Sequence, residues 1–205
     1  AQDQSFKKSE GAQSGVFQEE LTYKKIRRTY SVFSPESESE KFRPLLIGLH
    51  GYRGNGKEFA RKTADIIGDL AERGYVGIFP DGTSMSLLKS HITSFNDIDS
   101  QNSYGRDGPT CANSSYDYGV YTNCPKSQHE DLCNWGSSCI DDEGFFRELI
   151  EIAIKKWKVD PSRIYLTGFS QGAQAVQSLA WRMSDVIAAI APQSGFSANG
   201  YSKAP

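Results

Sequence analysis

Long hydrophobic runs are missing from this sequence. The two longest, LLIGL at residues 45–49 and VIAAIA at residues 186–191, are far shorter than the roughly 20 apolar residues of a membrane-spanning helix. The sequence also lacks an excess of charge of one sign, because 25 acidic and 23 basic residues give a net charge of −2. This balance provides no basic surface for a phosphate backbone or an anionic membrane. We therefore expect no membrane span and no nucleic-acid partner.

The first residues lack both an initiator Met and an apolar signal segment. Either a signal peptide has been removed, or the chain begins inside a longer reading frame. Residues 1–20 are predicted to form a flexible leader. Residues 21–205 are predicted to form one domain, because a chain of this size buries about 70% of its unfolded surface and needs no metal or disulfide to create a core.

Cysteine is rare and confined to one polar stretch. An even number of cysteines in a loop-rich segment favours two disulfides, and three pairings are possible. Free thiols in a cytosolic loop are the alternative, whereas spacings of 13, 9 and 6 residues lack the CxxC pattern of a zinc site. Asn113 begins an Asn-Ser-Ser glycosylation triplet, which agrees with secretion to the extracellular space. The four cysteines are Cys111, Cys124, Cys133 and Cys139.

Strand and helix signals alternate along the rest of the chain. Short apolar or β-branched runs predict strands at residues 24–34, 45–49, 75–79, 164–167 and 186–191. Helical stripes cover residues 57–73, 141–157 and 171–183, and Asp160-Pro161-Ser162 predicts a turn. Residues 83–139 show no periodicity and are predicted to be a loop insertion pinned by the cysteines. The order predicts an α/β fold with a mostly parallel central sheet flanked by helices.

The pentapeptide Gly168-Phe169-Ser170-Gln171-Gly172 matches GxSxG and lies between a predicted strand and a predicted helix. That setting is typical of a nucleophile elbow, in which a tight turn lifts a serine hydroxyl clear of the sheet edge. Glycines two residues before and after the serine avoid collisions with neighbouring backbone. Ser170 is therefore the candidate nucleophile.

Acyl transfer also needs N–H donors for the oxygen that becomes negative in the tetrahedral intermediate. The backbone N–H of Gln171 lies at a helix N-terminus, whose dipole favours an anion. The second donor is expected in the turn after the strand at residues 45–49, where Tyr52 is the first candidate and Arg53 the second. His50 in this turn is interpreted as a turn-stabilising imidazole, with a role as general base as the alternative.

Several other residues have both a structural and a functional interpretation. Asp141 and Asp142 are interpreted as a helix cap and dipole partner, although an acid pair is the alternative. His91 and His129 precede the nucleophile in the sequence and are expected at the surface. Three aromatic residues of the insertion belong either to a substrate pocket or to a local core: Tyr118, Tyr121 and Trp135.

Several ordered motifs resemble the α/β-hydrolase esterases that include polyhydroxybutyrate depolymerases, feruloyl esterases and acetylxylan esterases. The resemblance covers about residues 29–197. Its motifs are LLIGLHGYRGN, GYVGIFPDG, WGSSCIDDEGFF, VDPSRIYLTGFSQGA and IAAIAPQSG. It implies hydrolysis of a small or polymeric carboxylic ester by a Ser-His-Asp triad, without metal or cofactor. GFSQGA also resembles the elbow of acyl-protein thioesterases and small carboxylesterases, which keeps those activities as an alternative.

One departure from the family pattern affects activity. The family places the acid and then the histidine after the nucleophile, but residues 171–205 contain Asp185 as their one acid and no histidine. The resemblance places both missing triad members beyond Pro205, so the fold is expected to be incomplete at the C-terminus. Without the imidazole, the 205-residue chain is predicted to be nearly inactive. A catalytically inactive hydrolase fold that serves as a binding protein is the alternative of another class.

Overall fold

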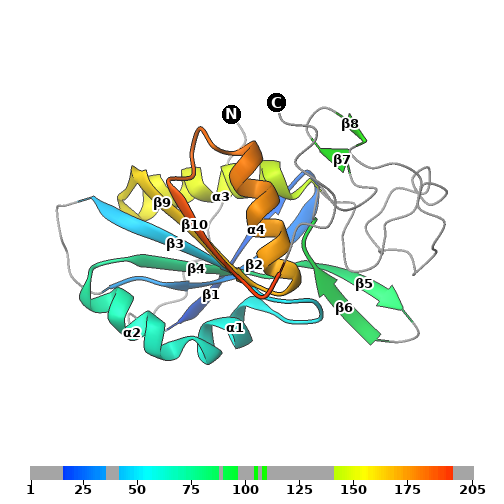
Figure 1. The fold of residues 1–205 in the computed structure, drawn as a ribbon, viewed down its shortest axis with the longest axis horizontal. Coiled ribbons are helices and arrows are strands. Elements are labelled where there is room, and N and C mark those ends of the chain that lie inside the picture. The colour runs from blue at the N-terminus through cyan, green and yellow to red at the C-terminus, as the bar shows by residue number, and fades with distance from the viewer. Residues whose placement is uncertain are drawn as a thin grey trace.

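The computed structural model describes residues 16–35, 42–87, 90–96, 104–105, 108–109 and 141–195. Its centre is a six-stranded sheet in the order β1-β2-β4-β3-β9-β10 (Figure 1). The neighbours β4, β3, β9 and β10 run parallel, whereas β1 and β2 are joined antiparallel at one side. The predicted, mostly parallel sheet is confirmed. The strands are β1 (Phe17–Tyr23), β2 (Ile26–Phe33), β3 (Arg43–Leu49), β4 (Val76–Pro80), β9 (Val159–Phe169) and β10 (Ala189–Gln193).

Helices cover both faces of the sheet (Figure 1). One face packs against α1 and α2 through a small cluster that includes Phe33, Ala60 and Phe79. The other face packs against α3 and α4 around the main core. Among the described residues, no helix has both the length and the apolar character of a membrane span. The helices are α1 (Gly56–Lys62), α2 (Ala64–Glu72), α3 (Asp142–Trp157) and α4 (Gln171–Arg182).

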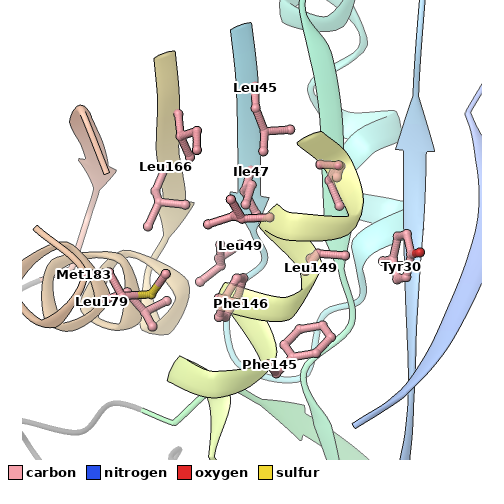
Figure 2. Packing of buried hydrophobic residues seen from close by; sticks show 14 of the residues in the cluster. Tyr30, Leu45, Ile47, Leu49, Phe145, Phe146, Leu149, Leu166, Leu179 and Met183 are labelled. Carbon is pink, nitrogen blue, oxygen red and sulfur yellow. The ribbon is translucent and has the colours of Figure 1, made fainter. Parts of the chain in front are cut away.

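The main core follows the two-residue period of the central strand. Leu45, Ile47 and Leu49 of β3 point to the same face, and all three are fully buried. Figure 2 shows Phe146 and Leu149 of α3 against this row. The apolar stripe of α3 thus buries the carboxyl end of β3, which places the turn after β3 on a rigid support.

The predicted leader is wrong at its C-terminal boundary, because residues 17–20 belong to β1. This strand pairs with β2 through a two-residue hairpin turn, in which Lys24 and Lys25 have φ values of 46° and 67°. A turn of this kind usually carries Asn-Gly, so its sequence signal is absent here. Only Leu21 of β1 is buried, and one buried side chain leaves little hydrophobic pattern to detect.

The helix predicted over residues 57–73 is divided into α1 and α2. Thr63 lies between them, and its hydroxyl donates to the carbonyls of Phe59 and Ala60 at 2.9 and 3.2 Å. A threonine that bonds back to the preceding turn competes with the regular helical pattern. Gly74, with a φ of 77°, follows α2 as the predicted stop signal.

The predicted absence of regular structure at residues 83–139 is also wrong in part. The hairpin β5 (Thr83–Leu87) and β6 (Ser90–Ser94) and the short pair β7 (Tyr104–Gly105) and β8 (Gly108–Pro109) lie within this range. Both pairs are antiparallel. The hairpin sequences TSMSL and SHITS contain the β-branched residues Thr83, Ile92 and Thr93, but four of their ten residues are serine, which makes the strand signal weak. The pairing between the two segments stabilises them instead.

The last two strands differ from the prediction in their bounds. The strand expected at residues 164–167 is the end of β9, which begins at Val159 and contains the predicted turn as an irregularity. There the Asp160 carboxylate accepts from the N–H of Ser162 at 3.0 Å. The last strand, β10, begins three residues later than expected, and all five of its residues are exposed.

Candidate active site

Ser170 occupies the junction between β9 and α4 in an unusual backbone conformation. Its φ is 55° and its ψ is −119°, which a residue with a side chain adopts only where the surroundings impose it. The Ser170 N–H donates to the carbonyl of Gln193 in β10 at 2.9 Å. The side chain is half-buried. The strand therefore ends in a sharp, fixed turn with an accessible serine at its tip.

The two glycines of the pentapeptide fit the close approach that the sequence predicted. A Cβ atom on Gly168 would lie 2.5 Å from the carbonyl oxygen of Gly172. A Cβ atom on Gly172 would lie 2.4 Å from the carbonyl oxygens of Leu49 and His50. Neither position has room for a side chain, so the turn depends on both glycines.

The turn after β3 lies against this elbow. A Cβ atom on Gly51 would lie 3.3 Å from the Cβ of Ser170, which places the turn after β3 beside the candidate nucleophile. The N–H of Arg53 donates to the carbonyl of Thr93 at 2.9 Å and is therefore engaged within the protein. This bond makes Arg53 a poor candidate for the second oxyanion donor, and the assignment of Tyr52 stays a prediction.

Gln171 provides the first candidate donor. It is the first residue of α4, so its N–H has no acceptor within the helix. The helix dipole favours negative charge at this end. An oxyanion next to Ser170 would meet this N–H at no cost in broken helical hydrogen bonds.

His50 is buried, and both of its ring nitrogens are hydrogen-bonded, one within its own turn and one to the segment after β4. Its Nδ1 lies 2.7 Å from the carbonyl oxygen of Gly51, and its Nε2 accepts from the N–H of Gly82 at 2.9 Å. This pattern requires a neutral imidazole with its proton on Nδ1. Burial lowers the pKa of His50, and this effect outweighs the hydrogen bond to Gly51. The geometry agrees with the turn-stabilising role predicted for this residue.

The adjacent acids at the start of α3 are both structural, but in different ways. Asp141 caps the helix by accepting from the N–H of Gly144 at 2.9 Å. Burial alone would raise the pKa of Asp141, but hydrogen bonds from Lys24, Gly144 and Tyr23 lower it overall. Asp142 is fully buried and forms an ion pair with Arg28 at 2.6 Å.

Other predicted residues lie outside this site or outside the described residues. His91 is on β6, opposite Ser86 of the hairpin. Asp185 forms a two-point ion pair with Arg147 at 3.0 and 3.1 Å at the surface. The described residues contain no cluster of His, Cys, Asp or Glu arranged as metal ligands. Predictions outside the described residues concern Cys111, Asn113, Tyr118, Tyr121, Cys124, His129, Cys133, Trp135 and Cys139.

One contact at the site was missed by sequence reasoning. The side chain of Gln171 is buried and binds both backbone polar groups of Phe95, a residue 76 positions away in the sequence. Phe95 itself packs its ring against the His50 imidazole with centroids 4.7 Å apart. A glutamine after the serine was the available signal, but its partner cannot be identified without the fold.

A mostly parallel sheet with a serine at a strand–turn–helix elbow defines the α/β-hydrolase class. The sequence of residues 40–194 matches the family described as serine hydrolase (FSH1). The chain belongs to this family. No curated protein sequence matches it significantly.

Solved structures with a similar fold agree with the resemblance seen in the sequence. An acetyl xylan esterase from Aspergillus awamori has a TM-score of 0.57 at 16% identity, over 89% of this chain and 53% of its own. A ferulic acid esterase has a TM-score of 0.55 at 21% identity, over 89% of this chain and 60% of its own. An S-formylglutathione hydrolase from Agrobacterium tumefaciens has a TM-score of 0.57 at 14% identity, over 90% and 60%. The chain thus spans between 53% and 60% of the length of these structures.

Proposed function

We propose that the protein is a carboxylic ester hydrolase in which Ser170 is the nucleophile. The observation that carries the proposal is the backbone of Ser170, with φ 55° and ψ −119° between β9 and α4. A conformation of this kind costs about 1–3 kcal/mol and persists at sites where strain serves a function. The membership in a serine hydrolase family supports the same assignment.

The reaction proceeds in two acyl transfers. The Ser170 Oγ attacks the ester carbonyl carbon while its proton passes to a base, and the carbonyl oxygen becomes an oxyanion. The N–H groups of Gln171 and Tyr52 bind this oxyanion. The intermediate collapses to an acyl-enzyme as the alkoxide leaves with a proton. Water then attacks the acyl-enzyme and releases the carboxylic acid, which restores the Ser170 hydroxyl.

The base and its acid partner are proposed to follow Pro205 in the sequence. Residues 171–205 contain no histidine, and their one acid, Asp185, is engaged with Arg147. His50 is committed to Gly51 and Gly82 and is a poor candidate for the base. We expect the 205-residue chain to turn over slowly, because loss of the imidazole typically lowers kcat by several orders of magnitude.

The substrate class follows from the resemblance. We propose an ester of a polyester chain, a feruloyl group or an acetyl group on a polysaccharide, with a short carboxylic ester or thioester as the alternative. Parallel assays with p-nitrophenyl acetate, methyl ferulate, acetylated xylan and an acyl thioester distinguish these classes. We also propose secretion, with disulfides among the four cysteines and glycosylation at Asn113. Titration of thiols in denaturant without reductant tests the disulfides, because four free thiols would contradict them.

A fluorophosphonate probe tests the nucleophile directly. We expect the full-length protein to be labelled at Ser170, and the variant Ser170→Ala to remain unlabelled. Ser162→Ala is the matched control, because it removes an exposed hydroxyl from the same strand, β9. Equal labelling of wild type and Ser170→Ala would contradict the proposal. Absence of labelling in a folded full-length protein would favour a catalytically inactive binding protein.

A further inference from the structure

The side chain of Gln171 forms a two-point contact with the backbone of Phe95. Its Oε1 accepts from the Phe95 N–H at 3.2 Å, and its Nε2 donates to the Phe95 carbonyl at 2.8 Å. Gln171 is 6% exposed and Phe95 is fully buried, so water does not replace either bond easily. The residue whose N–H is proposed to bind the oxyanion therefore uses its side chain to hold a distant segment.

The same segment is attached to the turn that follows β3. The Thr93 carbonyl accepts from the N–H of Arg53 at 2.9 Å, and the Thr93 hydroxyl donates to the carbonyl of Gly54. The Phe95 ring packs against the buried imidazole of His50, which belongs to this turn. Residues 93–95 thus bridge two walls of the site, the turn after β3 on one side and the start of α4 on the other.

The far end of the segment is fixed to the scaffold. The N–H of Asn96 donates to Asp142 Oδ2 at 2.6 Å, and the other carboxylate oxygen of Asp142 pairs with Arg28 at 2.6 Å. Arg28 and Asp142 are at most 2% exposed. A buried ion pair of this kind is costly to break, because a lone charge would remain without water. Residues 93–96 are therefore held at both ends, at Thr93 and at Asn96. The contact with Gln171 holds Phe95 between them.

We propose that the Gln171 side chain is a positioning residue that sets the distance between the two oxyanion donors. Through Phe95 it links its own backbone N–H to the turn that carries Tyr52. This inference rests on the proposed function. Without the side-chain amide, the Phe95 N–H and carbonyl lose their partners in a buried place, and the segment shifts to satisfy them. A displacement of about 1 Å in a catalytic arrangement can cost about 10²-fold in rate.

The variant Gln171→Met tests this role in the full-length protein. Methionine has a similar length, keeps the backbone N–H, and removes both hydrogen bonds to Phe95. We expect kcat for p-nitrophenyl acetate to fall by about 10- to 100-fold, less than the 10²- to 10³-fold loss of a whole donor. KM should change by less than about threefold, because the donors act on the transition state more than on the bound ester. Amide exchange at Phe95 should become faster.

A second variant breaks the bridge at its other end. Thr93→Val keeps the shape of the side chain and removes the hydroxyl that donates to Gly54. We expect a smaller fall in kcat, and in the double variant with Gln171→Met a loss well below the product of the two single losses, because either change frees the same segment. Ile150→Val, a buried change on α3, is the control for a general loss of stability.

Each outcome has a defined meaning. A kcat of Gln171→Met within about twofold of wild type would overturn the inference, as would independent, multiplicative effects of the two variants. An equal loss of kcat in Ile150→Val at matched stability would also overturn it. If wild type is neither labelled nor active, the proposed function fails, whereas unchanged Phe95 exchange in Gln171→Met refutes the contact itself.

Discussion

Strands β3 and β10 arise from similar short apolar runs but have opposite surroundings. β3 pairs with β4 and β9 and carries Leu45, Ile47 and Leu49, all fully buried. β10 pairs with β9 at the end of the sheet order, and each of its residues is exposed, including Ile190 at 37%. An apolar run therefore predicts a strand, while burial depends on the neighbours that the fold provides on both sides.

The largest difference between the two strands is expected for truncation of an isoleucine. Ile47→Ala in β3 should lower the free energy of unfolding by about 2–5 kcal/mol, because it leaves a cavity under α3. Urea unfolding followed by circular dichroism measures this loss, provided that the slope is unchanged. A loss below about 1 kcal/mol would mean that the core relaxes into the space and that β3 is not rigidly packed.

A somewhat smaller loss is expected where the end of β3 meets α4. Gly172→Ala places a Cβ 2.4 Å from the carbonyl oxygens of Leu49 and His50, so backbone atoms must move. Overpacking of this kind costs about 1–3 kcal/mol and should also slow labelling of Ser170.

Gly68→Ala is the matched control for that substitution. Gly68 lies inside α2 with no atom near its added Cβ, so the change should stabilise the protein by about 0.5–1 kcal/mol. Equal effects of the two substitutions would contradict the close packing at the elbow.

His50, which directly follows β3, should make the free energy of unfolding depend on pH. Burial lowers the pKa of His50, although Asp81 and Asp142 nearby act in the opposite direction. His50 therefore takes up a proton near pH 6.5 in the unfolded chain, but only at a lower pH in the folded chain. The contribution of His50 to the free energy of unfolding should be at its maximum above about pH 6.5. It should fall as the pH decreases towards the lowered pKa, by at most about 1.4 kcal/mol per pH unit.

Denaturant unfolding between pH 8 and pH 5 measures this slope. His50→Gln keeps an acceptor for Gly82 but does not titrate, so the slope should be smaller in this variant. Asp141 titrates at lower pH, because its pKa is also lowered, and leaves this window unaffected. An unchanged slope in His50→Gln would show that another group controls the acid sensitivity.

The parts of the fold that the sequence predicted well are those with local signals. α3 carries a cap, Asp141, and a continuous apolar stripe, and β3 carries a buried run, so both are placed almost to the residue. β1 was missed because one buried side chain, Leu21, gives no pattern. Thr63 divided a helix whose apolar stripe continues through it, because the competing hydrogen bonds leave no trace in periodicity.

The features of the candidate site fall into the same two groups, those with a local sequence signal and those without one. The elbow at Ser170 is local, since five consecutive residues and their flanking strand and helix define it. The contact between Gln171 and Phe95 joins segments 76 residues apart and depends on the hairpin β5–β6, which has no strong strand signal. A single sequence identifies the candidate nucleophile, but not the residues that hold its neighbours in place.

The smallest effect is expected at the edge of the sheet. Ile190→Ala in β10 should change the free energy of unfolding of this chain by less than about 1 kcal/mol, because substitutions at exposed positions rarely exceed this. Ile190 is 37% exposed whereas Ile47 is fully buried, so less apolar contact is lost at Ile190. The same urea experiment as for Ile47→Ala measures the value. A loss near that of Ile47→Ala would mean that another surface covers β10 in solution, and that the contrast between the two strands belongs to the isolated fold alone.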